Sequence, residues 1–528
     1  MFWIERVIAE SRVHSAAKIK AKTPLVVRDE KTASGRIHVG SLRGVVIHGV
    51  AGEALSEAEV PAQFVYEIND FDPFDDVPSS LEREKFAPFL GKPLFAVPSP
   101  EAGAENYAEY YGGEFIGVIK ELGFEVQTYR ASDYYKQGKF NAAIKTALEA
   151  RDLIAEIYER VSGGKRGKNW FPISVICEQC GKIGTTKVSS FDGARVTYEC
   201  GDFVEWAKGC GHKGEISPYD GNAKLLWKVE WAAKFVVLDV DVEGAGKDHS
   251  TKGGARDIAD AIAREVFHVE PPVNIPYEFF HIGGQKMSTS RGKGISAREM
   301  ADLLPPKLLR FLMIYKEPAR VIEFDPEGDT IPVLYDMYDR YAEEYFKGEQ
   351  GEHARMFYFA QAPSARKNLK KHLMPRFSEI AYLVQMPHLT LTEEIEMAYG
   401  VTLSKVDETE LEQRAAYAKI WLSRFAPPDY NFEIQKEFPE AARGLSTKQK
   451  EALSQVLAIF TDGKKLTGAE LHTRLHDIKT ETGIAPAEFF KALYRLFLGK
   501  ESGPKAGLLL GVLDPDLVRK RLKEAIES

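Results

Sequence analysis

A glycine-containing loop at residues 35–40 constrains the fold of this chain more than any other feature. It follows a short apolar run at residues 25–27, which predicts a buried strand, and it leads into residues 42–55, where apolar side chains recur with helical spacing. Residues 63–68 predict a second strand. Strand, glycine loop, helix and strand form the βαβ unit of a parallel nucleotide-binding sheet, although any doubly wound α/β fold can begin in this way.

The α/β pattern is interrupted and later resumes. Helical spacing at residues 107–120 and 140–161 is followed by a region of cysteines, short strands and turns. The α/β pattern returns at residues 227–270, with a strand predicted at residues 235–238, and again from residue 277. The nucleotide-binding fold is therefore predicted to be split by an insertion of about 110 residues.

Beyond about residue 331 the strand signals fade and helical periodicity remains, for example at Leu453, Val456 and Phe460. We therefore predict an α/β, Rossmann-like domain that is split by a cysteine-bearing insertion and followed by an all-α C-terminal domain. The predicted boundaries are 1–110 for the first half of the nucleotide-binding domain, 111–225 for the insertion, 226–330 for the second half and 331–528 for the helical domain.

The charge balance limits the class of partner. The 528 residues include 70 basic and 78 acidic side chains, a net charge of -8, unlike a small DNA-binding module with a basic surface. A large enzyme can still bind RNA by confining its basic groups to one face. The first residues do not resemble a signal peptide, and no apolar run approaches the roughly 20 residues of a membrane span. We expect a cytoplasmic protein with no DNA or membrane partner.

The first glycine loop has the chemistry of an anion site. Backbone N–H groups at a helix start point outward, and the helix dipole favours negative charge. Ser34, Gly35 and Ser41 flank the turn. Gly40 lets a ligand approach the backbone closely, and His38 can donate a hydrogen bond to a phosphate oxygen. Taken alone, His38 is more readily explained as a polar residue at a helix start.

A second loop combines a lysine with hydroxyl groups and flanking glycines. Its residues are Lys286, Met287, Ser288, Thr289 and Ser290. A lysine with clustered hydroxyls and mobile glycines can hold a pyrophosphate and close over it, but such a loop is often only solvated surface. The two loops together, on either side of a split nucleotide-binding fold, favour an enzyme that binds the phosphates of ATP.

The two loops resemble the signature motifs of the class I aminoacyl-tRNA synthetases, a His-X-Gly-His element after the first strand and a Lys-Met-Ser-Lys-Ser element. His38 and Gly40 match the first motif. The second motif is matched by Lys286, Met287, Ser288 and Ser290. The chain departs from the motifs at Ser41, where a second histidine would stand, and at Thr289, which replaces the second lysine.

Further stretches are similar to the class I lysyl-tRNA synthetases of archaea and some bacteria. That family also carries a small residue before the last serine of its second motif, as Thr289 does here. Residues 29–31, Asp-Glu-Lys, depart from the Ser-Gly-Ile-like stretch that the family usually shows. The similarity extends over nearly the whole chain and is clearest at residues 32–40, 69–72, 226–231, 246–249 and 277–279.

This resemblance implies a class I catalytic domain that attaches lysine to its tRNA through a lysyl-adenylate, with ATP and Mg²⁺, and a helical domain that binds the anticodon. His38 and Lys286 would be the catalytic residues. Asp248 is a candidate for a ribose hydroxyl, and His249 could equally be structural. The implied ATP site consists of Ser34, Gly35, His38, Gly40, Ser41, Asp248, His249, Lys286, Met287, Ser288, Thr289 and Ser290.

A pocket for lysine needs a carboxylate for the ammonium and aromatic faces for the alkyl stem. Trp227 and Trp231, four residues apart, could instead form a buried helix stripe. The candidate carboxylates are Glu67, Asp70, Asp72 and Glu278, and the predicted pocket consists of Thr32, Asp70, Trp227, Trp231 and Tyr277. A glutamyl- or cysteinyl-tRNA synthetase, a non-catalytic RNA-binding relative and an unrelated nucleotidyltransferase with a zinc ribbon remain alternatives.

All four cysteines fall between Cys177 and Cys210. The Cys177-X-X-Cys180-Gly turn is of the zinc-knuckle type, and Cys200 and Cys210 are near enough in sequence to complete a tetrahedral Cys₄ site. This pattern predicts a structural zinc ion in a zinc-ribbon-like part of the insertion, with His212 able to replace one thiolate. A redox Cys-X-X-Cys is the main rival, but it normally begins a helix in a small α/β domain.

Overall fold

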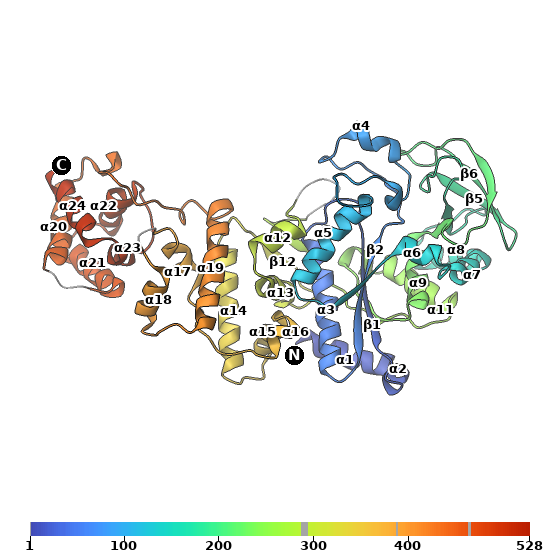
Figure 1. The fold of residues 1–528 in the computed structure, drawn as a ribbon, viewed down its shortest axis with the longest axis horizontal. Helices are drawn as coiled ribbons and strands as arrows, with labels where there is room; N and C mark the ends of the chain where they lie inside the picture. Colours follow the sequence, from blue (N-terminus) through green and yellow to red (C-terminus); the bar gives the residue numbers. More distant parts are fainter. Residues whose placement is uncertain (1, 287–293, 387–388, 463–465) are drawn as a thin grey trace. The chain divides into compact units, whose positions relative to one another are not determined.

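The computed structural model describes residues 2–286, 294–386, 389–462 and 466–528, which form two compact units (Figure 1). The first unit consists of Met1–Phe324 and Arg340–Lys370, and the second consists of Asp325–Asp339 and Lys371–Ser528. Among the described residues, no helix combines the length and the apolar character that crossing a membrane requires.

A parallel sheet lies at the centre of the first unit. Its order is β3-β2-β1-β9, and each neighbouring pair is parallel. The first four residues of β1 are buried, as the apolar run predicts. The predicted βαβ unit is confirmed, because the helix α3 (Gly40–Glu57) connects β1 to β2. The strands are β1 (Leu25–Thr32), β2 (Ala62–Asn69), β3 (Val126–Arg130) and β9 (Val240–Val242).

The helix α3 packs closely on one face of this sheet because glycines line its inner side. A Cβ atom at Gly49 would lie 2.4 Å from a ring carbon of Phe124, and one at Gly52 would lie 3.8 Å from Val27. The other face is approached by α9 (Trp227–Val237), whose Lys234 reaches the side chains of β1 and β2. The strands β1 and β2 are therefore covered on both faces, as the inner strands of parallel sheets generally are, whereas the edge strand β3 is partly exposed.

Two expectations about the elements need correction. The stretch 235–238 was predicted as a strand, but residues up to Val237 belong to α9 and the strand is the following β9. The apolar run forms helix because Trp231 and Phe235, four apart, are buried on one face of α9. The strand β3 lies within the range 111–225 given to the insertion, yet it belongs to the central sheet, so the insertion begins after Arg130.

The insertion combines helices with short antiparallel strands. Its cysteine-bearing part contains a three-stranded sheet of order β5-β6-β7, and β4 pairs with β8. Its elements are α6 (Ala131–Lys136), α7 (Asn141–Glu149), α8 (Arg151–Ser162), β4 (Ile173–Val175), β5 (Thr186–Phe191), β6 (Val196–Cys200), β7 (Lys213–Ile216) and β8 (Ala223–Leu225).

The remaining elements of the first unit surround the sheet and continue it. Single parallel bridges join Val242 to Val273 and Gly246 to Tyr277, and β10 pairs with both β11 and β12. These elements are α1 (Trp3–His14), α2 (Ala16–Lys20), α4 (Arg83–Phe86), α5 (Tyr107–Glu121), α10 (Lys247–Ser250), α11 (Ala255–Glu265), β10 (Phe280–Ile282), β11 (Gln285–Lys286), α12 (Ala297–Leu303), α13 (Pro306–Ile314), β12 (Ile322–Phe324), α15 (Glu352–Ala360) and α16 (Pro363–Arg366).

Beyond Phe324 the described part of the chain is helical, so the predicted helical C-terminal region is confirmed. Local signals start several of its helices. Ser404, Ser446 and Thr467 each form a capping box that satisfies backbone N–H groups of the first turn. The helices are α14 (Thr330–Phe346), α17 (Phe377–Leu383), α18 (Leu391–Tyr399), α19 (Lys405–Arg424), α20 (Thr447–Thr461), α21 (Gly468–Thr482), α22 (Pro486–Leu498), α23 (Ala506–Val512) and α24 (Pro515–Glu527).

Candidate active site

A cavity of about 430 Å³ opens at the carboxyl ends of β1 and β9. Ligands of open parallel sheets bind at this edge, because the helices that follow the strands start there. The cavity brings together residues from both halves of the split domain. The sequence-predicted residues that line it are Thr32, His38, Gly40, Ser41, Asp72, Trp227, Trp231, Asp248, His249, Tyr277 and Glu278.

Other predicted residues do not line this cavity. Asp70 is buried, and its carboxylate accepts hydrogen bonds from the backbone N–H and the hydroxyl of Ser132, at 2.8 and 2.6 Å. The carbonyl of Ser34 accepts a hydrogen bond from Tyr107, and Gly35 is buried beside it. Lys286 belongs to β11, its side chain is outside the described part of the structure, and Met287, Ser288, Thr289 and Ser290 lie outside the described residues.

The backbone of the first glycine loop pairs with the segment that follows the second loop. His38 forms a single antiparallel bridge with Ser296. The N–H of Val39 donates to Ile295 at 3.0 Å, and the N–H of Ala297 donates to Ile37 at 2.9 Å. Main-chain hydrogen bonds therefore hold the first motif against residues 295–297, although about 260 residues of chain separate the two segments.

The inner side of α3 meets β1 at a cluster of polar groups. A Cβ atom at Gly44 would lie 2.7 Å from the hydroxyl of Tyr277 and 2.9 Å from a carboxylate oxygen of Asp29, so only glycine fits. The backbone N–H of Gly244 donates to Nε2 of His48 at 2.6 Å, which leaves Nδ1 as the donor to the Gly44 carbonyl. Burial raises the pKa of Asp29 to about 6.

Aromatic rings form one wall of the cavity. Trp227 and Trp231 stack with their ring centroids 6.0 Å apart, and the ring of His249 meets both of them edge-on. Trp227 is 45% exposed, whereas Trp231 is 6% exposed and its indole N–H donates to Glu243 at 2.7 Å. The two tryptophans are therefore more than a buried helix stripe, because one of them presents its ring to solvent beside the cavity.

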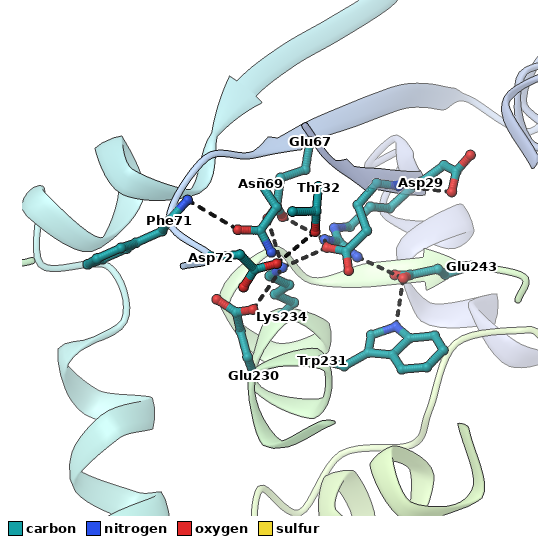
Figure 2. A network of polar contacts seen from close by, with 12 residues as sticks. Asp29, Thr32, Glu67, Asn69, Phe71, Asp72, Glu230, Trp231, Lys234 and Glu243 are labelled. Carbon is teal, nitrogen blue, oxygen red and sulfur yellow. Dashed lines mark hydrogen bonds and ion pairs between the residues drawn. The ribbon is translucent and has the colours of Figure 1, made fainter. Parts of the chain in front are cut away.

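A buried network of opposite charges underlies the cavity (Figure 2). The ammonium of Lys234 lies 2.6 Å from Glu30, 2.7 Å from Glu67 and 3.3 Å from Glu230. The guanidinium of Arg28 also contacts Glu30 and Glu67, and it lies 2.7 Å from Glu243. Each buried charge has partners of opposite sign, which offsets the cost of removing it from water.

A second ammonium extends the network toward the end of β2. Lys224 lies 2.6 Å from Glu230 and 2.9 Å from Asp72, whose other oxygen accepts from the hydroxyl of Thr32 at 2.7 Å. Burial alone would lower the pKa of Lys224, but these carboxylates raise it above its ordinary value. The Lys224 ammonium is therefore held in its charged form and in a fixed position.

Sequence reasoning missed most of this network. Glu67 and Asp72 were candidates for the substrate charge, but Arg28, Lys234 and Glu243 were not considered. One local signal existed, because Glu230 and Lys234 stand four apart in a mostly apolar helix. The other pairs join residues far apart in the sequence, such as Lys234 and Glu30, and no local pattern reveals them.

The four cysteines form a compact group. Their Sγ atoms all lie within 4.8 Å of one another. The Cys177–Cys210 and Cys180–Cys200 pairs are 3.6 and 3.7 Å apart, too far for disulfides. Tetrahedral zinc with bonds of about 2.3 Å would separate its sulfurs by about 3.8 Å, so the donor set fits zinc. His212 is not part of the metal-compatible group found among the described residues.

The sequence of this chain is similar to those of known proteins. Residues 1–362 match the sequence model of the family described as tRNA synthetases class I (K), and residues 411–526 match that of an anticodon binding domain. The lysine--tRNA ligase of Methanosarcina barkeri strain Fusaro is 34% identical, covering 98% of this chain and 97% of its own. The lysine--tRNA ligase of Archaeoglobus fulgidus is 32% identical, covering 93% and 95%. Among solved structures, a glutamate tRNA ligase from Elizabethkingia meningosepticum is 12% identical, with a TM-score of 0.43, covering 96% and 99%.

Proposed function

This chain belongs to the class I tRNA synthetases, in the lysine branch of that family, and on this premise we propose that it attaches lysine to tRNA with ATP as the energy source. The observation that carries the proposal is the cavity at the strand ends. It joins His38 and Gly40 of the first motif to an aromatic wall and a floor of buried carboxylates.

The first step forms lysyl-adenylate. A carboxylate oxygen of lysine attacks the α-phosphorus of ATP, and pyrophosphate leaves with the electrons of the broken P–O bond. The imidazole of His38 and the N–H groups at the start of α3 stabilise the negative charge on the pentavalent phosphorus. Lys286 would hold the departing pyrophosphate, and Mg²⁺ that accompanies ATP would supply further positive charge. This step needs no covalent enzyme nucleophile.

The second step transfers the lysyl group to tRNA. The terminal 2′-hydroxyl attacks the adenylate carbonyl and AMP departs. Positioning and charge stabilisation supply most of the rate, as in phosphoryl transfer generally. The match of residues 411–526 to an anticodon binding domain supports a role for the helical C-terminal region in holding the anticodon of a lysine tRNA. A tRNA-charging enzyme works where translation occurs, which we place in the cytoplasm.

The test of the substrate is ATP–pyrophosphate exchange measured separately with lysine, glutamate and cysteine, with and without tRNA. We expect exchange with lysine alone among the three. Lys286→Ala should lose exchange while keeping its affinity for tRNA, because the side chain acts on pyrophosphate. Exchange with glutamate or cysteine in place of lysine would overturn the assignment, and unchanged exchange in the Lys286→Ala enzyme would remove the role of the second motif.

Glu243 is the carboxylate that we assign to the ammonium of lysine. It is 2% exposed, it lines the cavity, and no described residue donates a hydrogen bond to its Oε2 atom. Its Oε1 is fixed by Arg28 and Trp231, so the second oxygen is held at the cavity floor beside the aromatic wall. An alkylammonium whose stem lies against Trp231 can therefore meet a fixed negative charge.

Replacing this charge by an amide tests the assignment. Glu243→Gln keeps the shape of the side chain, so we expect KM for lysine to rise roughly 10- to 100-fold, since a hydrogen bond to a charged group is worth about 1.5–3 kcal/mol. KM for ATP should change little. Glu10→Gln, on the exposed side of α1, is the matched control. An equal rise of both KM values would show that the substitution disturbs the whole cavity and that Glu243 does not read the ammonium.

We further propose that the four cysteines hold a structural zinc ion in a zinc-ribbon-like segment. The sulfur separations and the short antiparallel strands β5, β6 and β7 beside them support this proposal. Elemental analysis should find one zinc per chain, and Cys180→Ser should lower both the zinc content and the melting temperature. His212→Ala is the control and should keep its zinc. A zinc-free wild type that melts at the same temperature as the zinc-loaded protein would contradict the proposal.

A further inference from the structure

Alternate side chains of β1 point to opposite faces of the central sheet. Arg28 and Glu30 face the buried charge network, where Lys234 is their partner or neighbour. Val27 and Asp29 face α3, since they approach Gly52 and Gly44 of that helix. Figure 2 shows Asp29 pointing away from Lys234. By the two-residue period of a strand, Lys31 also belongs to the face that meets α3.

Lys31 therefore stands opposite the first turn of α3. Val27 of β1 lies beside Gly52 of α3, and Asp29, two residues further along the strand, lies beside Gly44. One further step of the strand brings Lys31 toward Gly40 and Ser41, which line the same cavity. Its charge also lowers the pKa of His249 on the opposite wall, although burial of that ring has the larger effect.

The surroundings of Lys31 contain no anion that fixes its ammonium. Its side chain forms no hydrogen bond or salt bridge with any residue that the structure describes, although Asp29 and Glu30 are its chain neighbours. The start of a helix carries partial positive charge, which disfavours a cation nearby. Burial lowers the pKa of Lys31, although Asp29 and Glu30 oppose this effect, so an anion bound beside it in the cavity would favour its charged form.

We propose that Lys31 is a further catalytic residue. Its ammonium reaches from β1 to the α-phosphate of ATP, while His38 and the start of α3 contact the same phosphate from the other side. This inference rests on the proposed function. As the lysine carboxylate forms its bond to the α-phosphorus and the bond to pyrophosphate breaks, negative charge grows on the α-phosphate oxygens. Lys31 stabilises that charge with an N–H···O hydrogen bond and keeps its own proton.

The sequence supplies a reason for an extra cation at this position. The chain has Ser41 where the general motif has a second histidine, and Thr289 where the general motif has a second lysine. Both departures remove groups that can be positively charged near the phosphates. Lys31 supplies one positive charge to the α-phosphate, and it does so from β1 rather than from either loop.

The experiment compares lysine-dependent ATP–pyrophosphate exchange in the full-length wild type, Lys31→Met, Lys31→Arg and Lys31→Ala. Removing one preorganised donor from a transition-state oxygen costs about 100-fold or more in kcat. We expect Lys31→Met to lose about 100-fold in kcat with KM for lysine changed less than about threefold, and Lys31→Arg to recover at least about tenfold of the loss. Added ethylammonium should partly restore the Lys31→Ala enzyme.

Controls separate this role from a structural one. Lys20→Met removes an exposed lysine of the same unit and should leave kcat and the melting temperature unchanged. If Lys31→Met folds poorly, the Lys31→Arg enzyme and amine rescue of Lys31→Ala still report on the charge. The proposal is overturned if Lys31→Met keeps kcat within about threefold of wild type, or if the loss falls on KM for lysine. A wild type without lysine-dependent exchange would instead contradict the proposed function.

Discussion

Asp29 carries a largely buried carboxyl group at the edge of the cavity, which links stability to pH. Burial raises its pKa from 3.8 to about 6, and His48 lowers it only in part. A carboxyl whose pKa is raised by folding binds its proton more tightly in the folded state. The stability that it contributes is complete below about pH 4 and is lost as the pH rises through about 6.

Asp29→Asn should remove this loss, because an amide is neutral at every pH. We expect the variant to be more stable than the wild type above about pH 6, by about 3 kcal/mol, and to match it below about pH 4. Thermal unfolding followed between these pH values measures the difference. A variant that is less stable by the same amount at every pH would mean that Asp29 acts through its contacts and not through its charge.

Single residues also show where sequence reasoning reaches its limit. The motif residues His38 and Gly40 line the cavity, as predicted. A local pattern of strand, loop and helix is enough to place them there. Asp70 was a candidate for the pocket, but its carboxylate instead accepts a hydrogen bond from the hydroxyl of Ser132. Once a strand has ended, its alternation no longer says which way the next side chain points, so Asp70 and Asp72 could not be told apart.

Among the elements, α19 (Lys405–Arg424) depends on one fully buried cation. Arg414 is 0% exposed, and its guanidinium lies 2.8 Å from Asp339 of α14 and from Glu410 one turn earlier. It also donates to the carbonyl of Pro375 at 2.8 Å. Removing the cation would break both ion pairs and leave two largely buried carboxylates without their arginine partner.

Arg414→Met should therefore lower the free energy of unfolding of the second unit by about 3–5 kcal/mol. The free energy of unfolding of Arg414→Lys should lie between those of Arg414→Met and the wild type, since an ammonium keeps the charge but cannot reproduce the forked geometry. Calorimetry of the purified proteins measures the shift, and Arg424→Met, which removes an exposed arginine of the same helix, is the control. Equal melting temperatures for the two methionine variants would refute the prediction.

The elements were predicted correctly where the apolar periodicity extends over several turns, and the prediction failed where the apolar run is short. The apolar positions around Leu453 and Phe489 lie in α20 and α22, because several helical turns repeat the same signal. The four apolar residues at 235–238 fit a strand and a helix equally well. Packing of Trp231 and Phe235 decided the outcome, and that packing involves partners outside the local sequence.

At the scale of the whole molecule, the chain returns to the first unit after leaving it. Arg340–Lys370 belongs to the first unit, whereas Asp325–Asp339 belongs to the second. The returning segment satisfies buried charges of the catalytic half. The guanidinium of Arg310 donates to the carbonyl of Phe359 at 3.0 Å, and Arg366 pairs with Glu53 and Glu57. A domain boundary at residue 331, as the sequence suggests, would separate these partners.

A fragment of residues 1–324 should therefore be less stable than one of residues 1–370. Without the returning segment, Arg310 loses the carbonyl of Phe359, and Glu53 loses Arg366 and keeps Arg310 as its remaining partner. Buried charges that lose part of their compensation destabilise the fold. We expect the shorter fragment to aggregate or to melt at least about 5 °C lower. Size-exclusion chromatography and thermal melts of both fragments measure this. Two soluble fragments with the same melting temperature would show that residues 340–370 are dispensable.

The backbone pairing of His38 with Ser296 also makes the order of synthesis matter. About 260 residues separate the two, and a ribosome that adds about 5–20 residues per second needs roughly 13–50 s to make them. During that interval the nascent chain already exposes its first glycine loop without the segment that completes it. The catalytic centre is thus assembled late in translation, after more than half of the polypeptide has emerged.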